Sequence, residues 1–132
     1  MKPESQPGFW HSRGKSIACA VRGIALLLKT QPNARIHLLA TVLVTAAGFF
    51  FHLKAREWTA ITFAIGLVWV AEGVNTAIEI LADRVTRDRD EQIGMAKDIA
   101  AGAVMLASIT SVFTGIFILG PHAWALLRGH AG

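Results

Sequence analysis

The chain has 132 residues, of which 53% are hydrophobic and 17% are charged, and its mean hydropathy is +0.46. A soluble domain of this length normally carries more charge, so the composition indicates a single domain that lies in a membrane. The single cysteine, Cys19, excludes an internal disulfide and a cysteine-based zinc site. The net charge of +4 comes from basic residues near the N-terminus, which indicates contact with lipid headgroups rather than with nucleic acid.

The first apolar segment, at about residues 9–29, has the pattern of an amphipathic helix that lies on the membrane surface. Ile17, Val21 and Ile24 recur at helical spacing, and the basic residues fall on other faces. The basic residues also interrupt the apolar run, which excludes a signal peptide. The helix is expected to end before Pro32, because proline disfavours a helical conformation in the residue that precedes it.

Three longer apolar segments follow, at about residues 33–53, 57–85 and 95–119. Each is long enough to cross the hydrocarbon layer, which takes about 20 helical residues. A charged connector at residues 84–91 separates the last two and is too polar to enter the bilayer. The predicted fold class is therefore an all-α membrane protein with one surface helix and three transmembrane helices, within a single domain at residues 1–132.

The distribution of lysine and arginine predicts how the chain is oriented. Most of these residues lie in the N-terminal segment and in the charged connector, whereas the loop between the first two spans holds only Lys54 and Arg56. Cytoplasmic loops are enriched in positive charge. We therefore expect a multi-pass protein of the cell inner (cytoplasmic) membrane, with its N-terminus in the cytoplasm.

A polar stripe interrupts the second predicted span, and it is formed by Glu72, Asn75, Thr76, Glu79 and Asp83. Their spacing places all five on one face of a helix. Ionisable side chains at membrane depth are costly and are kept where they face a protein interior or a water-filled cavity and serve a function. Two carboxylates with an amide between them suit metal binding together with proton abstraction.

Small residues recur at intervals of four along the last span, at Ala103, Ala107, Ser111 and Gly115. Such a pattern allows helices to approach closely in lipid, either within one chain or between chains. We expect a homo-oligomer, because a catalytic pocket needs more walls than three short spans supply.

The string from Glu72 to Arg84, with the pattern ExxNTAIExxxDR, is followed by a polar connector and by AKDxxxxAV from Ala96 to Val104. This combination resembles the bacterial integral-membrane diacylglycerol kinase family, which includes the undecaprenol kinases. The resemblance covers about Lys15 to Pro121. It implies a homotrimeric kinase that transfers the γ-phosphate of ATP, with Mg²⁺, to the hydroxyl of a membrane lipid alcohol, either diacylglycerol or undecaprenol.

The resemblance also implies roles for individual residues. Glu72 matches the catalytic base, with Asn75 one turn away to orient it or the phosphate, and Glu79 matches the magnesium ligand. Further residues match positions at the nucleotide, namely Lys97, Asp98, Lys15, Asp88, Arg89 and Asp90. Because the chain has neither GxxxxGK[ST] nor GxGxxG, phosphoryl transfer would depend on carboxylates, magnesium and lysine carried by helices.

One position departs from the family pattern. Gln31 stands where the family often has a second magnesium-binding glutamate, four residues before the match of Arg35. A neutral amide oxygen is a weaker magnesium ligand than a carboxylate. We expect Gln31 to line the nucleotide site, and its role as a ligand stays open.

Simpler interpretations apply to several of these residues when each is taken alone. Asp83 could pair with Arg84 or Arg87 or cap its helix, Trp69 could serve packing, and His37 could be an interface anchor. The alternative functions are a small proton-coupled transporter that uses Glu72 and a non-catalytic membrane assembly subunit. The second alternative predicts tolerance of Glu72→Gln.

Overall fold

A computed structural model of the chain describes residues 9–85 and 90–129. Throughout these ranges the elements are helices, which confirms the predicted all-α fold: α1 (Phe9–Thr30), α2 (Pro32–Phe50), α3 (Ala55–Val85) and α4 (Glu91–Gly129). By length and composition, α2, α3 and α4 could each cross a membrane, as the sequence predicted.

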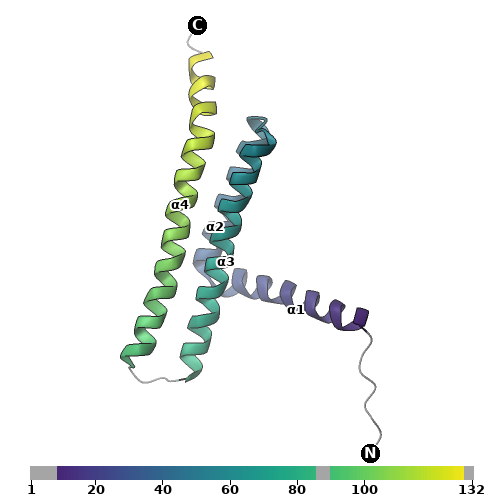
Figure 1. Cartoon of the computed structure of the whole chain (residues 1–132), viewed down its shortest axis with the longest axis vertical. Coiled ribbons are helices and arrows are strands. Elements are labelled where there is room, and N and C mark those ends of the chain that lie inside the picture. Colours follow the sequence, from purple (N-terminus) through teal and green to yellow (C-terminus); the bar gives the residue numbers. More distant parts are fainter. Residues whose placement is uncertain (1–8, 86–89, 130–132) are drawn as a thin grey trace, which may run out of the picture.

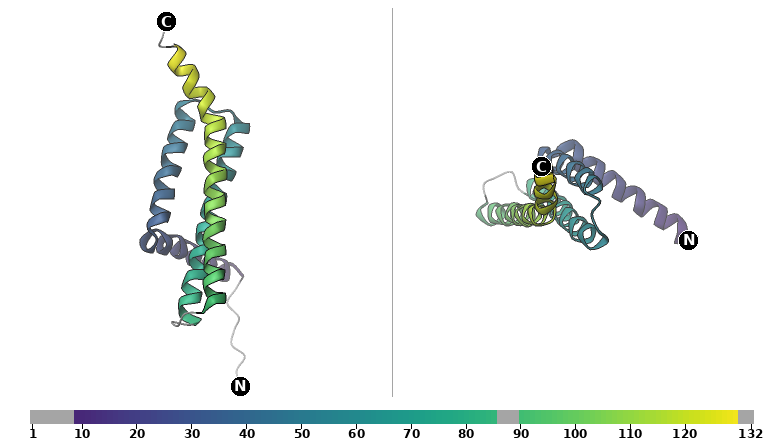
Figure 2. Two further views of the ribbon diagram at one scale, coloured as in Figure 1. Left: turned by 90° about the vertical axis from the view of Figure 1, so that its left-hand side faces the viewer. Right: turned by 90° about the horizontal axis from the view of Figure 1, so that it is seen from above.

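The helix pair α3 and α4 forms the centre of the fold. The two helices run antiparallel and side by side, and their contact is the most extensive in the chain (Figure 1). α2 lies beside this pair, and α1 leaves the bundle crosswise, with its N-terminal half projecting away from the other helices (Figure 2). This crosswise direction is compatible with the predicted position of α1 along a membrane surface.

The corner between α1 and α2 is fixed by proline and arginine. Gln31 has an extended backbone and Pro32 opens α2, where its missing N–H costs no helical hydrogen bond. The Arg35 guanidinium donates from Nε to the Leu28 carbonyl at 3.0 Å and from Nη2 to the Lys29 carbonyl at 2.7 Å. These carbonyls belong to the last turn of α1, so a cation of α2 caps α1 and sets the angle between the two helices.

A tight turn connects the C-terminal end of α2 to the N-terminal end of α3. His52 adopts a left-handed conformation with φ 52°, and the Lys54 N–H donates to Glu57 Oε2 at 2.8 Å as α3 begins. The other Glu57 oxygen lies 2.9 Å from His122 Nε2 of α4, and the His122 ring stacks on Phe51. One carboxylate therefore joins the turn to α4.

α4 is longer at both ends than the span predicted at residues 95–119. Its first turn is capped by Asp90 Oδ1, which accepts the N–H groups of Gln92 at 2.9 Å and Ile93 at 3.1 Å. The helix also continues past Pro121, a residue tolerated inside membrane helices when neighbouring contacts hold the segment. The contacts of His122 with α3 and the turn supply that support.

Among the described residues few side chains are buried. The buried apolar ones on the paired helices are Ile61, Val68 and Ala82 of α3 and Ala100, Val104 and Ala107 of α4. Large apolar side chains elsewhere are exposed, including Phe63 at 76% and Phe117 at 75%. In water such a surface would aggregate, whereas in a bilayer it faces acyl chains. The exposure pattern therefore agrees with three membrane-spanning helices.

Gly48 of α2 leaves room for the Trp58 ring of α3. A Cβ atom at this position would lie 2.8 Å from the Trp58 ring, and that ring is held against Phe49 at 4.9 Å between centroids. We expect Gly48→Leu to displace Trp58 and to lower the free energy of unfolding by about 1–3 kcal/mol. Thermal unfolding in detergent micelles measures the change.

The matched control is Gly66→Leu in α3, where an added Cβ meets no atom within 4 Å. Its melting temperature should stay near that of the unchanged chain. Equal losses in both variants would contradict a specific contact between Gly48 and Trp58.

Candidate active site

The polar stripe of α3 is divided by depth. Glu72 is 2% exposed, Asn75 8% and Thr76 5%, whereas Glu79 is half-buried and Asp83 is exposed. All five residues lie on one continuous helix, as predicted. Glu72, Asn75 and Glu79 line one cavity, whereas Thr76 lines a hollow shared with α1 and α2. The stripe runs from a buried carboxylate to an open one within three helical turns.

The buried end of the stripe is not satisfied by other protein groups. Asn75 Nδ2 donates to Glu79 Oε1 at 3.1 Å, so the amide orients the half-buried carboxylate. Within residues 13–85 and 90–129, no hydrogen-bond partner reaches Glu72 Oε2, Asn75 Oδ1 or Thr76 Oγ1. An unpaired buried polar atom costs about 1–3 kcal/mol, and more when it is charged. These atoms are therefore candidates for contact with a ligand.

A cavity of about 310 Å³ opens beside Glu72 and Asn75. α3 contributes Glu72, Asn75 and Glu79, and the other polar walls come from Asn33 and His37 of α2 and from Ser108 of α4. The cavity thus needs all three spans.

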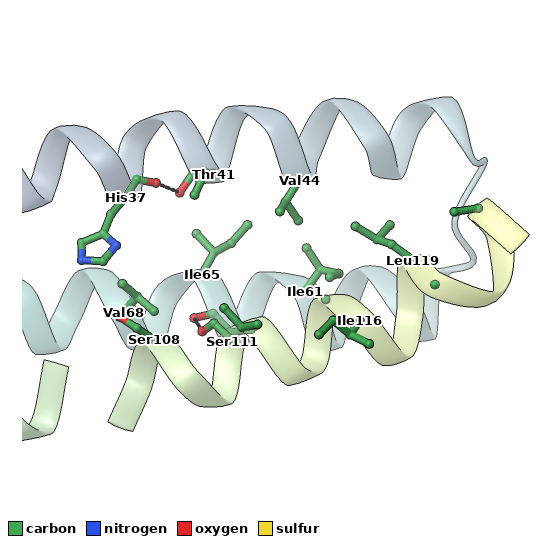
Figure 3. Close-up of a pocket in the computed structure, with 16 residues that line it drawn as sticks. His37, Thr41, Val44, Ile61, Ile65, Val68, Ser108, Ser111, Ile116 and Leu119 are labelled. Carbon is green, nitrogen blue, oxygen red and sulfur yellow. Dashed lines mark hydrogen bonds between the residues drawn. The ribbon is translucent and has the colours of Figure 1, made fainter. Parts of the chain in front are cut away.

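A second cavity of about 520 Å³ lies next to the first, among α2, α3 and α4. Its walls are apolar side chains such as Val44, Ile65 and Ile116, and it shares His37 and Ser108 with the polar cavity (Figure 3). A polar cavity therefore adjoins a hydrocarbon-lined one, an arrangement that suits a molecule with a polar head and an apolar chain.

Lys97 brings a cation to the open end of the stripe. Its Nζ lies 2.9 Å from Asp83 Oδ1, and it also interacts electrostatically with Glu79. Asp83 thus pairs with Lys97 of α4 in place of the suggested Arg84. Both side chains are accessible to solvent, so this ion pair contributes little stability and can open at small cost.

The oxygen atoms of the stripe fit a hard dication only in part. Carboxylate and amide oxygens are suitable donors for magnesium. Among the described residues, however, no group of three or more His, Cys, Asp or Glu could hold a metal ion by itself. The residues therefore fit a dication that takes most of its ligands from phosphate groups and water.

The structure does not bring every predicted residue to this cavity. Asp98 is exposed next to Lys97, and the Asp90 carboxylate caps α4. Gln31 sits half-buried at the corner of α1 and α2, and Asn33 lines the cavity in its place. Lys15 is exposed on α1, which makes no contact with α4 in the described part of the chain. Asp88 and Arg89 lie outside the described residues.

Three polar residues at the cavity, Asn33, His37 and Ser108, were not selected as site residues from the sequence. Asn33 and His37 are four residues apart on α2, and Ser108 lies eleven residues after Lys97 on α4. All three are polar side chains on the helix faces that meet the α3 stripe. The sequence alone does not show which faces of α2 and α4 these are.

Comparison with known proteins agrees with this geometry. The family model for prokaryotic diacylglycerol kinase matches residues 18–119. The undecaprenol kinase of Bacillus subtilis is 36% identical over 107 residues, which cover 81% of this chain and 87% of that protein. A diacylglycerol kinase of Synechocystis is 36% identical over 113 residues, 85% of this chain and 65% of that protein.

The diacylglycerol kinase of Escherichia coli is 30% identical over 83 residues, 63% of this chain and 68% of that protein. The matched region contains the polar stripe of α3, Lys97, all of α2 and α3, and α4 as far as Leu119. The chain therefore belongs to the prokaryotic diacylglycerol kinase family and is a membrane lipid kinase.

Proposed function

We propose that the protein transfers the γ-phosphate of ATP to the hydroxyl of a membrane lipid alcohol, forming phosphatidic acid from diacylglycerol or undecaprenyl phosphate from undecaprenol. The observation that carries this proposal is the buried Glu72 carboxylate, which lines a polar cavity beside an apolar one and has an oxygen with no hydrogen-bond partner among the described residues. Family membership favours this activity over proton-coupled transport or a purely structural role.

Glu72 is the proposed catalytic base. Its Oε2 accepts the hydroxyl proton while the lipid oxygen forms a bond to the γ-phosphorus. The bond between that phosphorus and the bridging oxygen breaks, ADP leaves with the electron pair, and the proton later passes from Glu72 to solvent. The low exposure of Glu72 keeps competing water away from the hydroxyl.

Asn75 and Glu79 form the proposed phosphate and metal side of the site. The Asn75 amide donates to Glu79 and so holds that carboxylate toward the cavity. Mg²⁺, when bound at Glu79, would neutralise charge on the phosphate oxygens. The Asn75 Oδ1 atom is free to accept a hydrogen bond from the nucleotide or from metal-bound water.

The nucleotide is proposed to enter at the open end of the stripe. Lys97 would exchange its weak pairing with Asp83 for the more highly charged phosphates of ATP, and Asp98 lies beside it. The sequence resemblance alone supports five further proposed contacts with the nucleotide, at Asp90, Asp88, Arg89, Lys15 and Gln31. In this chain Lys15 could reach a nucleotide only by a change in the position of α1 or at the site of a second copy.

We further propose a homotrimer in the cell inner membrane, with the N-terminus in the cytoplasm and α1 on the membrane surface. Small residues support close packing between copies: Ala71, Ala100, Ala103 and Ala107 line a hollow on a face of α3 and α4 that also includes Asn75. The concentration of basic residues in the N-terminal segment supports the orientation.

Purified protein with ATP and Mg²⁺ should phosphorylate diacylglycerol, undecaprenol or both, measured by transfer of radiolabelled phosphate into the lipid phase. Glu72→Gln should lower the rate by at least about 10²-fold because no base then accepts the proton. Glu79→Gln should lower it similarly and raise the Mg²⁺ concentration needed for half-maximal rate.

Glu91→Gln in the exposed first turn of α4 is the matched control and should retain activity. Size-exclusion chromatography should give the same elution volume for all variants. A folded protein that labels neither lipid, or a fully active Glu72→Gln variant, would refute the proposed reaction.

Lys97→Met should raise the KM for ATP about tenfold or more, since a charge-assisted hydrogen bond to phosphate is worth about 1.5–3 kcal/mol. The KM for the lipid should change little. Steady-state kinetics with each substrate varied in turn measures both values. Asp83→Asn removes the same ion pair and should have a much smaller effect, so equal effects would mean that Lys97 acts only through Asp83.

A further inference from the structure

α2 is held in the bundle by few interactions. Its buried residues are Ala34 and Gly48, and most of its other side chains are exposed. Apolar contacts between helices give little net stabilisation in a bilayer, since acyl chains offer equivalent contacts. Hydrogen bonds, which are directional, must therefore contribute much to fixing the rotation and height of α2 beside α3.

Within the described residues, a single side-chain hydrogen bond joins α2 to α3 or α4. Trp69 Nε1 of α3 donates to Thr41 Oγ1 of α2 at 3.1 Å. The Thr41 hydroxyl in turn donates to the His37 carbonyl at 2.7 Å, one turn earlier on α2 (Figure 3). The hydroxyl thus accepts from one helix while its own proton is occupied, which fixes its orientation.

The position of this bond relates it to the polar cavity. Trp69 lies three residues before Glu72 on α3, and Thr41 lies four residues after His37 on α2. Glu72 and His37 line the same cavity from opposite helices. Any rotation of α2 at Thr41 would move the His37 wall relative to the Glu72 carboxylate.

We propose that Trp69 and Thr41 are positioning residues whose hydrogen bond holds the α2 wall of the acceptor cavity opposite Glu72. The inference rests on the proposed function, because it assigns this wall to the lipid acceptor. It also revises the interpretation of Trp69 as a packing residue. Phenylalanine could fill much of the same space but has no N–H to donate.

The test combines Trp69→Phe, Thr41→Val and the double variant. Each single change should raise the KM for the lipid acceptor about three- to tenfold, the range expected from a bilayer hydrogen bond. The KM for ATP should stay constant. The double variant should be no worse than either single variant because both remove one bond, and Thr41→Ser should retain the KM of the unchanged chain.

Two controls match these changes. Thr114→Val removes a hydroxyl that bonds only to the Thr110 carbonyl of its own helix, and Trp124→Phe changes an exposed tryptophan. Both should leave the lipid KM unchanged. Additive effects of Trp69→Phe and Thr41→Val, or lower thermal stability with an unchanged lipid KM, would overturn the positioning role.

A second measurement does not depend on activity. Spin labels at Leu43→Cys and Phe113→Cys, both exposed sites, report the distance from α2 to α4 in a Cys19→Ser background diluted with unlabelled protein. The distance distribution should broaden in Trp69→Phe and Thr41→Val and stay narrow in the controls. An unchanged distribution would refute the inference, even if no lipid is phosphorylated. Broadening without any lipid phosphorylation would instead refute the proposed function and, with it, the assignment of this wall to an acceptor.

Discussion

A carboxylate lies between helices that could each cross a membrane, and one of its oxygens has no hydrogen-bond partner in the part of the chain that the structure describes. Burying Glu72 in this way costs free energy that a glutamine or leucine would not cost. The surrounding structure makes the burial possible, because α2 and α4 cover the middle of α3 while leaving a polar cavity against it. The other features of the site are arranged around this buried oxygen.

The site changes from charged to apolar along the length of the helices. Toward one end, Glu79, Asp83 and Lys97 form an accessible set of charges that phosphates could enter at little cost. Toward the other, the apolar cavity follows α2 and α4 up to the turn that Glu57 and His122 join. Such a division suits a reaction between a water-soluble nucleotide and a lipid, whose reactive groups meet only at the boundary between the two environments.

Charged residues in this chain serve structure as well as chemistry. Arg35 caps α1, Asp90 caps α4, and Glu57 ties the α2–α3 turn to α4. Each satisfies backbone or side-chain groups near a helix end, where they would otherwise be unpaired. Family resemblance alone assigned Asp90 to the nucleotide, and the structure adds a capping role that does not depend on a ligand.

The helical class, the three long apolar helices and the polar face of α3 could be predicted from the sequence, because hydrophobic length and helical spacing are local properties of the chain. The motif around Lys97 likewise pointed to that residue. The pairing of Asp83 with Lys97, the contribution of Asn33, His37 and Ser108 to the cavity, and the bond from Trp69 to Thr41 could not be predicted in this way. These pairings join different helices, and the rotation of one helix against another depends on side-chain packing across the interface, which the period of a single helix does not encode.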